Sequence, residues 1–175
     1  MKMTWAHGRT ASERIPGARA WIYNPYLLLV FRLFLAAIFI YAAVQKIGKP
    51  LAFADEIHSY SIVDYGAPLY AMAIVLPWLE LLCGLSLVAG VFVRGSALIL
   101  LVLNAMFLVV IAKRTVGIVH GGTPFFEVYF DCGCGFGATY AWKKLLEDAV
   151  YFGLSAILLF APMHRFTLSR SRRSS

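Results

Sequence analysis

The chain has 175 residues, of which 61% are hydrophobic and only 14% charged, and its formal net charge is +7. This composition is too apolar for a water-soluble domain of this length, so most of the surface must face lipid. The basic residues gather in two tails and at the ends of apolar segments, which excludes a nucleic-acid-binding face and indicates contacts with anionic lipid.

The sequence predicts an all-α integral membrane protein, a bundle of about four transmembrane helices formed by residues 26–161. Basic tails precede and follow this domain, over residues 1–25 and 162–175. Because positively charged segments stay in the cytoplasm, both termini are expected there, and the bundle is expected in the inner or plasma membrane. The first apolar run is long enough to span the bilayer and lacks a cleavage site, so it should be an uncleaved anchor.

The first span is predicted over residues 26–44, entered through Asn24 and Pro25 and ended by a Gly-Lys-Pro cluster. The mixed segment that follows, residues 51–65, has apolar residues at helical spacing with charged residues between them. This pattern predicts a short helix lying on the outer membrane interface.

The second span is predicted over residues 69–92, broken in its first half by Pro77. A tight link containing Arg94 should lead into the third span. Within the second span, Cys83 is expected to pack as a small apolar residue. Gly84 is expected to let a neighbouring helix approach closely.

The third span is predicted over residues 96–112, closed by Lys113 and Arg114. A long glycine-rich loop over residues 115–140 follows, and it holds two of the three cysteines. With both tails inside, this loop and the loop after the first span should lie outside the membrane.

The fourth span is predicted over residues 144–160. Glu147 and Asp148 lie near its start, where the positive end of a helix dipole favours acidic residues. Lys143 and Lys144 precede them and are candidates to supply positive potential to a nearby thiol, whose pKa must be low if it is to react.

Cys132 and Cys134 form a C-x-C pair in the glycine-rich loop. Two thiols one residue apart can close a small strained ring, and strained, exposed disulfides exchange readily. A thioredoxin-like partner could then exchange a disulfide with this loop. The alternative is a static disulfide or a reduced pair, while a metal site that includes His120 is disfavoured because the spacing differs from that of zinc ligands.

Two charged residues fall inside predicted spans: Arg32 in the first and Glu80 in the second. A charge at the bilayer centre costs about 3 kcal/mol on insertion scales, so both should face the bundle interior, where they could form a loose pair. Lys46 and Gln45, at the outer end of the first span, are alternative partners for Glu80. The interpretation stays open between a structural ion pair and a polar site for a quinone head group or a proton path.

Together these residues resemble the DoxX-like superfamily and, within it, the methylamine utilisation MauE family. The matching pieces are Arg32 to Ala36, Lys46, Pro77 to Glu80, Gly84 and Asp131 to Gly137. They are spread over nearly all of residues 26–161. One departure is Gly135, which is added to the C-G-C-F-G pattern of the family and leaves the thiol pair intact.

The resemblance implies a four-helix membrane protein that acts with a thioredoxin-like extracytoplasmic partner in forming or shuffling disulfides of an exported dehydrogenase. Methylamine dehydrogenase is one candidate client. On this hypothesis Cys132 and Cys134 are the catalytic thiols of a membrane thiol–disulfide oxidoreductase, and Arg32, Glu80 and Lys46 shape an intramembrane polar site. A quinone is the candidate cofactor, and no metal is expected.

Two competing interpretations remain open from the sequence. One is a non-enzymatic assembly or scaffold subunit, in which the cysteines form a structural disulfide and the buried charges determine packing. The other is a small-molecule transporter or lipid-binding protein. The charges within the spans favour it, but this sequence lacks the paired discontinuous helices that transporter sequences often show.

Overall fold

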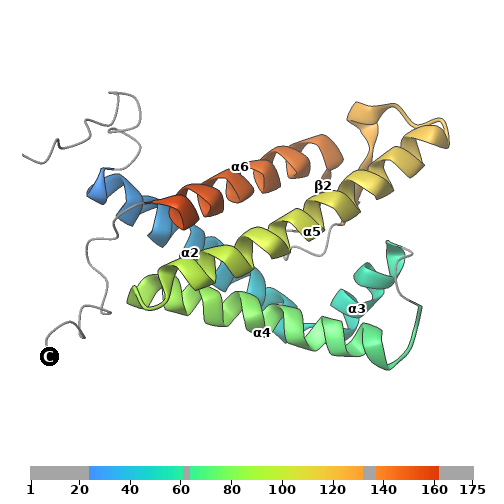
Figure 1. The fold of residues 1–175 in the computed structure, drawn as a ribbon. Coiled ribbons are helices and arrows are strands. Elements are labelled where there is room, and N and C mark those ends of the chain that lie inside the picture. The colour runs from blue at the N-terminus through green and yellow to red at the C-terminus, as the bar shows by residue number, and fades with distance from the viewer. Residues whose placement is uncertain (1–23, 61–63, 132–136, 162–175) are drawn as a thin grey trace, which may run out of the picture.

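The computed structural model describes residues 24–60, 64–131 and 137–161. Four long helices dominate this part of the chain (Figure 1), so the prediction of a mainly helical protein is confirmed. The helices are α2 (Pro25–Gly48), α3 (Pro50–Ser59), α4 (Ala67–Ala89), α5 (Val93–His120) and α6 (Ala141–Phe160). A 3-10 turn, η1 (Phe125–Glu127), and two short strands, β1 (Tyr129–Asp131) and β2 (Ala138–Tyr140), lie between α5 and α6.

Three of these helices, α2, α4 and α5, are long and apolar enough to cross a membrane. The protein is therefore a multi-pass membrane protein. The remaining long helix, α6, has 20 residues but carries charged residues in its first half, which makes it less apolar than the other three.

The four long helices form two pairs. α2 packs most extensively on α4, and α5 packs most extensively on α6, whereas the contacts between the pairs are fewer. One apolar cluster joins all four helices, and each contributes a completely buried leucine to it: Leu35, Leu87, Leu100 and Leu158.

The bundle has two distinct ends (Figure 1). The start of α2, the link between α4 and α5, and the end of α6 lie at one end, while α3 and the strand pair lie at the other. At the first end, Arg94 donates a hydrogen bond of 2.9 Å to the carbonyl of Ala161, which fastens the start of α5 to the end of α6. The start of α2 and the end of α6 therefore lie at the same end of the bundle.

The start of α2 is formed as the sequence predicts. The side chain of Asn24 accepts a hydrogen bond of 3.0 Å from the backbone N–H of Tyr26, and Pro25 occupies the first helical turn. This cap satisfies one of the backbone donors that a helix start leaves unpaired, and proline has no N–H to satisfy there.

Two predictions about the second span are wrong. Pro77 lies inside α4, which continues through it, because membrane helices tolerate proline when neighbouring helices support the freed backbone. Arg94 is not in the link but in the first turn of α5. The link is formed by Gly90, Val91 and Phe92, and both Gly90 and Phe92 adopt the left-handed conformation that a reversal of this kind requires.

α5 is also longer than predicted, because it continues past Lys113 and Arg114 to His120. Arg114 stays within the helix since its guanidinium lies 5.3 Å from the ring centroid of Tyr60 and 4.8 Å from that of Phe130. These contacts hold the charge against the residue that follows α3 on one side and against β1 on the other.

The short helix predicted after the first span is present as α3. Its residues Phe53, Ala54 and Ile57 are buried against Leu69 and Ala73 of α4. Its position on the outer interface stays a prediction.

The region predicted as one long loop holds an antiparallel strand pair. Tyr129 lies opposite Tyr140, and Asp131 lies opposite Ala138. Cys132 and Cys134 belong to the segment between the strands and lie outside the described residues.

Candidate functional site

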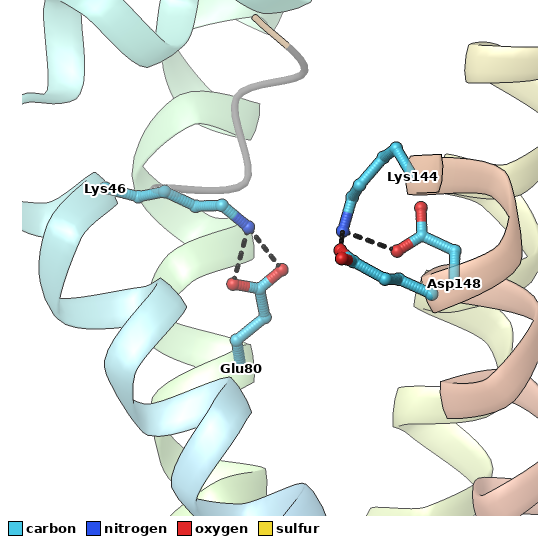
Figure 2. A network of polar contacts seen from close by, with 5 residues as sticks. Lys46, Glu80, Lys144 and Asp148 are labelled. Atoms are coloured by element: carbon cyan, nitrogen blue, oxygen red, sulfur yellow. Dashed lines mark hydrogen bonds and ion pairs between the residues drawn. The ribbon is translucent and has the colours of Figure 1, made fainter. Parts of the chain in front are cut away.

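An ion pair between α2 and α4 lies inside the bundle (Figure 2). Lys46 Nζ, in the last turn of α2, is 2.8 Å from both carboxylate oxygens of Glu80 in α4. The two side chains are only 5% and 1% exposed. Lys46 was one of the two alternative partners that the sequence offered for Glu80.

Close packing of α2 on α4 determines which residue meets Glu80. A Cβ atom on Gly84 would lie 2.7 Å from Ile40 Cγ1 and 3.3 Å from the carbonyl oxygen of Ala36, so the two helices touch where Gly84 has no side chain. Glu80 is about one turn from this point. Arg32 lies 14 residues before Lys46, about 21 Å along α2, and does not line the cavity that contains the ion pair.

Lys46 also contacts two aromatic rings. Its Nζ lies 5.1 Å from the ring centroid of Phe53 in α3 and 4.9 Å from that of Phe107 in α5. Each ring face attracts a cation, and this attraction is strongest away from water. Lys46 therefore connects four helices through one ammonium group.

A second ion pair lies on α6. Lys144 Nζ is 2.7 Å from Asp148 Oδ1, one turn further along, and both side chains are buried. Glu147 Oε2 is 4.0 Å from the same ammonium and is more exposed. Lys144 thus points into the bundle and binds Asp148, whereas Lys143 is exposed.

The two pairs line one cavity of about 30 Å³. Figure 2 shows them facing one another, Lys46 and Glu80 on one side and Lys144 and Asp148 on the other. The rest of the lining comes from α2, α5 and α6 and is mostly apolar or aromatic: Ile38, Phe39, Ala42, Asn104, Phe107 and Tyr151. The cavity therefore lies at the junction of the two helix pairs, with two positive and two negative charges on its wall.

Sequence reasoning did not place three of the polar residues at this cavity: Asn104 was not singled out, and Lys144 and Asp148 were expected only near the start of the fourth span. Asn104 is the single polar residue in the apolar run over residues 97–112, and that isolation was an available signal. The one-turn spacing of Lys144 and Asp148 predicts an ion pair but does not reveal that the pair faces inward.

The other residues singled out in the sequence fall elsewhere. Cys83 is buried in the apolar cluster, as predicted for a small apolar residue. Arg32 is buried in α2, away from this cavity. Among the described residues, no three His, Cys, Asp or Glu side chains gather closely enough to hold a metal ion.

A family model described as methylamine utilisation protein MauE matches residues 24–161. No curated protein and no solved structure matches the chain. The matched residues include every described helix, both ion pairs and the C-x-C segment, and they make up most of the sequence. The resemblance read from the sequence is thereby confirmed, and the chain belongs to the MauE family of methylamine utilisation proteins.

Proposed function

We propose that this protein is the membrane component of an extracytoplasmic thiol–disulfide system, in which Cys132 and Cys134 exchange a disulfide with a thioredoxin-like partner. Membership of a methylamine-utilisation family and the multi-pass membrane fold support a role in protein maturation at the membrane. The observation that carries the thiol function is the C-x-C pair itself, bracketed by strands β1 and β2.

The arrangement of the two bundle ends supports an extracytoplasmic position for the cysteine pair. The start of α2 and the end of α6, which adjoin the basic tails in the sequence, lie at the end opposite to the strand pair. If the tails are cytoplasmic, as their positive charge favours, then the strand pair is on the outer face. Disulfides persist in the oxidising surroundings on the extracytoplasmic face of the inner or plasma membrane.

This topology includes α6 as the fourth span. Its Lys144 and Asp148 neutralise one another inside the bundle, and its 20 residues would cover about 30 Å. That length matches the hydrocarbon thickness of a bilayer.

The proposed exchange is a thiol–disulfide exchange in two steps. A thiolate of one partner attacks the disulfide of the other, a mixed disulfide forms, and the second thiol of the attacking pair releases it. One disulfide is reduced to two thiols while one dithiol is oxidised to a disulfide, so two electrons and two protons change hands. A lipid-soluble quinone could take up the same two electrons and two protons from the reduced cysteine pair and become a quinol.

The test is the redox behaviour of the cysteine pair in purified protein, measured by alkylation and mass spectrometry across a glutathione series. We expect a reversible couple at roughly −270 to −120 mV, the range of known exchange proteins. The single variants Cys132→Ser and Cys134→Ser each keep one loop thiol. That thiol should trap the partner as a mixed disulfide, because the second thiol that would release it is missing.

Cys83→Ala is the matched control, because Cys83 is buried among apolar side chains and should leave the couple unchanged. A pair that stays oxidised at every potential, or never closes, would contradict the relay. It would favour the scaffold alternative, in which partner binding survives loss of both loop cysteines.

A further inference from the structure

The cavity between the helix pairs contains two buried polar atoms with unused hydrogen-bonding capacity. Asn104 Nδ2, on α5, and Asp148 Oδ2, on α6, have no hydrogen-bond partner, and both residues are 3% exposed. A buried polar atom left in this state destabilises the fold. One of the two is a donor and the other an acceptor, and both residues line the same space.

We propose that this cavity is a binding site for a hydroxyl group. The hydroxyl oxygen accepts a hydrogen bond from Asn104 Nδ2, and its O–H donates a hydrogen bond to Asp148 Oδ2. A hydroxyl is both a donor and an acceptor, so a single group satisfies both atoms.

The charges on the cavity wall favour an uncharged ligand. Both oxygens of Glu80 bind Lys46, and Asp148 Oδ1 binds Lys144, so the two positive and two negative charges are matched within the protein. An anion or a cation would enter without an opposite charge to pair with, which is costly in a low-dielectric interior.

The size of the cavity fits the same chemistry. Its volume of about 30 Å³ is enough for one hydroxyl-sized group or a water molecule. Phe39, Phe107 and Tyr151 line the same space, so the part of its wall that is not polar is largely aromatic.

Two sources can supply this hydroxyl: water, or an aromatic diol such as a quinol that reaches the site from the bilayer. The quinol source rests on the proposed function, since a quinol is the reduced form of a two-electron carrier. Asp148 lies eight residues beyond Tyr140, the last residue of β2, or about 12 Å along α6. A carrier bound there would lie close to the strands that bracket the cysteine pair.

The experiment measures binding of decylubiquinol to the full-length protein in lipid nanodiscs. We expect saturable binding that Asn104→Leu weakens about tenfold or more, because leucine branches at Cγ as asparagine does but has no hydrogen-bond donor. Asn104→Ser, which keeps a hydroxyl donor, should recover part of the loss. Ser155→Ala is the matched control: Ser155 Oγ is also buried without a partner, but it does not line this cavity.

Infrared spectroscopy with ¹⁸O-labelled water tests whether water supplies the hydroxyl. If quinol does not bind, a strongly bound water should give an O–H band that shifts with ¹⁸O in the native protein and in Ser155→Ala, and that Asn104→Leu abolishes. Absence of both Asn104-dependent quinol binding and an Asn104-dependent water band would overturn the proposal.

The result can be separated from the fate of the thiol relay. A Cys132→Ser, Cys134→Ser double variant should bind decylubiquinol, or retain the water band, as the native chain does. Failure of the relay thus leaves the hydroxyl site standing, and failure of the hydroxyl site leaves the redox couple of the cysteines standing.

Discussion

The Lys46 side chain connects four helices of the bundle. Its ammonium binds Glu80 of α4 and lies over aromatic rings of α3 and α5 while its own backbone belongs to α2. Such a group is stable in the interior only while its counter-charge is present. The ion pair therefore couples the packing of all four elements to one contact.

Glu80→Leu should destabilise the protein by about 3–5 kcal/mol, because it leaves the Lys46 ammonium buried without a carboxylate. The double variant Lys46→Met, Glu80→Leu should regain most of that loss, since it removes both charges and keeps similar volumes. Reversible unfolding in mixed detergent micelles measures both. If the single and double variants were equally stable, the pair would not hold the helices together.

At the scale of elements, the contact of α2 with α4 depends on one glycine. Gly84 lets α4 approach Ala36 and Ile40 so closely that a Cβ atom would collide with Ile40. Helices in membranes associate largely through close packing of this kind, because lipid gives little hydrophobic drive between them. The same contact sets the register that brings Lys46 to Glu80.

Gly84→Ala should therefore cost about 1–3 kcal/mol, the usual penalty for overpacking. Gly117→Ala is the matched helical control, because no atom lies within 4 Å of the position its Cβ would take. It should be neutral or stabilise α5 by up to about 1 kcal/mol. Thermal unfolding of the two variants side by side tests the difference, and equal effects would rule out the close contact at Gly84.

The start of α2 was easier to predict than the end of α5. Asn24 and Pro25 act on the turn that follows them, so the sequence is enough to place the start of α2. The end of α5 depends instead on contacts of Arg114 with Tyr60 and Phe130, which lie on other elements. No local pattern contains that information.

In the candidate site, too, local sequence predicted some features, and contacts between helices determined the others. Charge within apolar spans identified Arg32 and Glu80 as interior residues, because an unpaired charge in lipid is costly, and it offered Lys46 only as an alternative partner for Glu80. The choice between Arg32 and Lys46 required the register of α2 on α4. The inward direction of Lys144 and Asp148 required the position of α6 on α5, which the sequence alone does not specify.

At the scale of the whole molecule, the two ends of the bundle should lie on opposite sides of the membrane. Phe92, in the α4–α5 link, is 81% exposed, and Phe126, in η1, is 71% exposed at the other end of α5. In a variant that lacks the native cysteines, Phe126→Cys should react with a membrane-impermeant maleimide in sealed cells. Phe92→Cys should react only after permeabilisation.

The reverse pattern would overturn the proposed orientation and would put the C-x-C pair in the cytoplasm. Labelling of both positions from outside would contradict the assignment of α5 as a span. Each variant therefore also serves as the other's control for reagent access.

The difference between the two ion pairs has a consequence for biogenesis. Lys144 and Asp148 are one turn apart on the same helix, so their charges can neutralise as soon as α6 forms. Lys46 and Glu80 belong to separate helices and stay unmatched until α2 and α4 meet, and an unmatched charge is costly where it lies within the bilayer. If α6 is the fourth span, as proposed, it reaches the insertion machinery with this ion pair already neutralised, whereas α2 and α4 gain full stability in lipid only once they have paired.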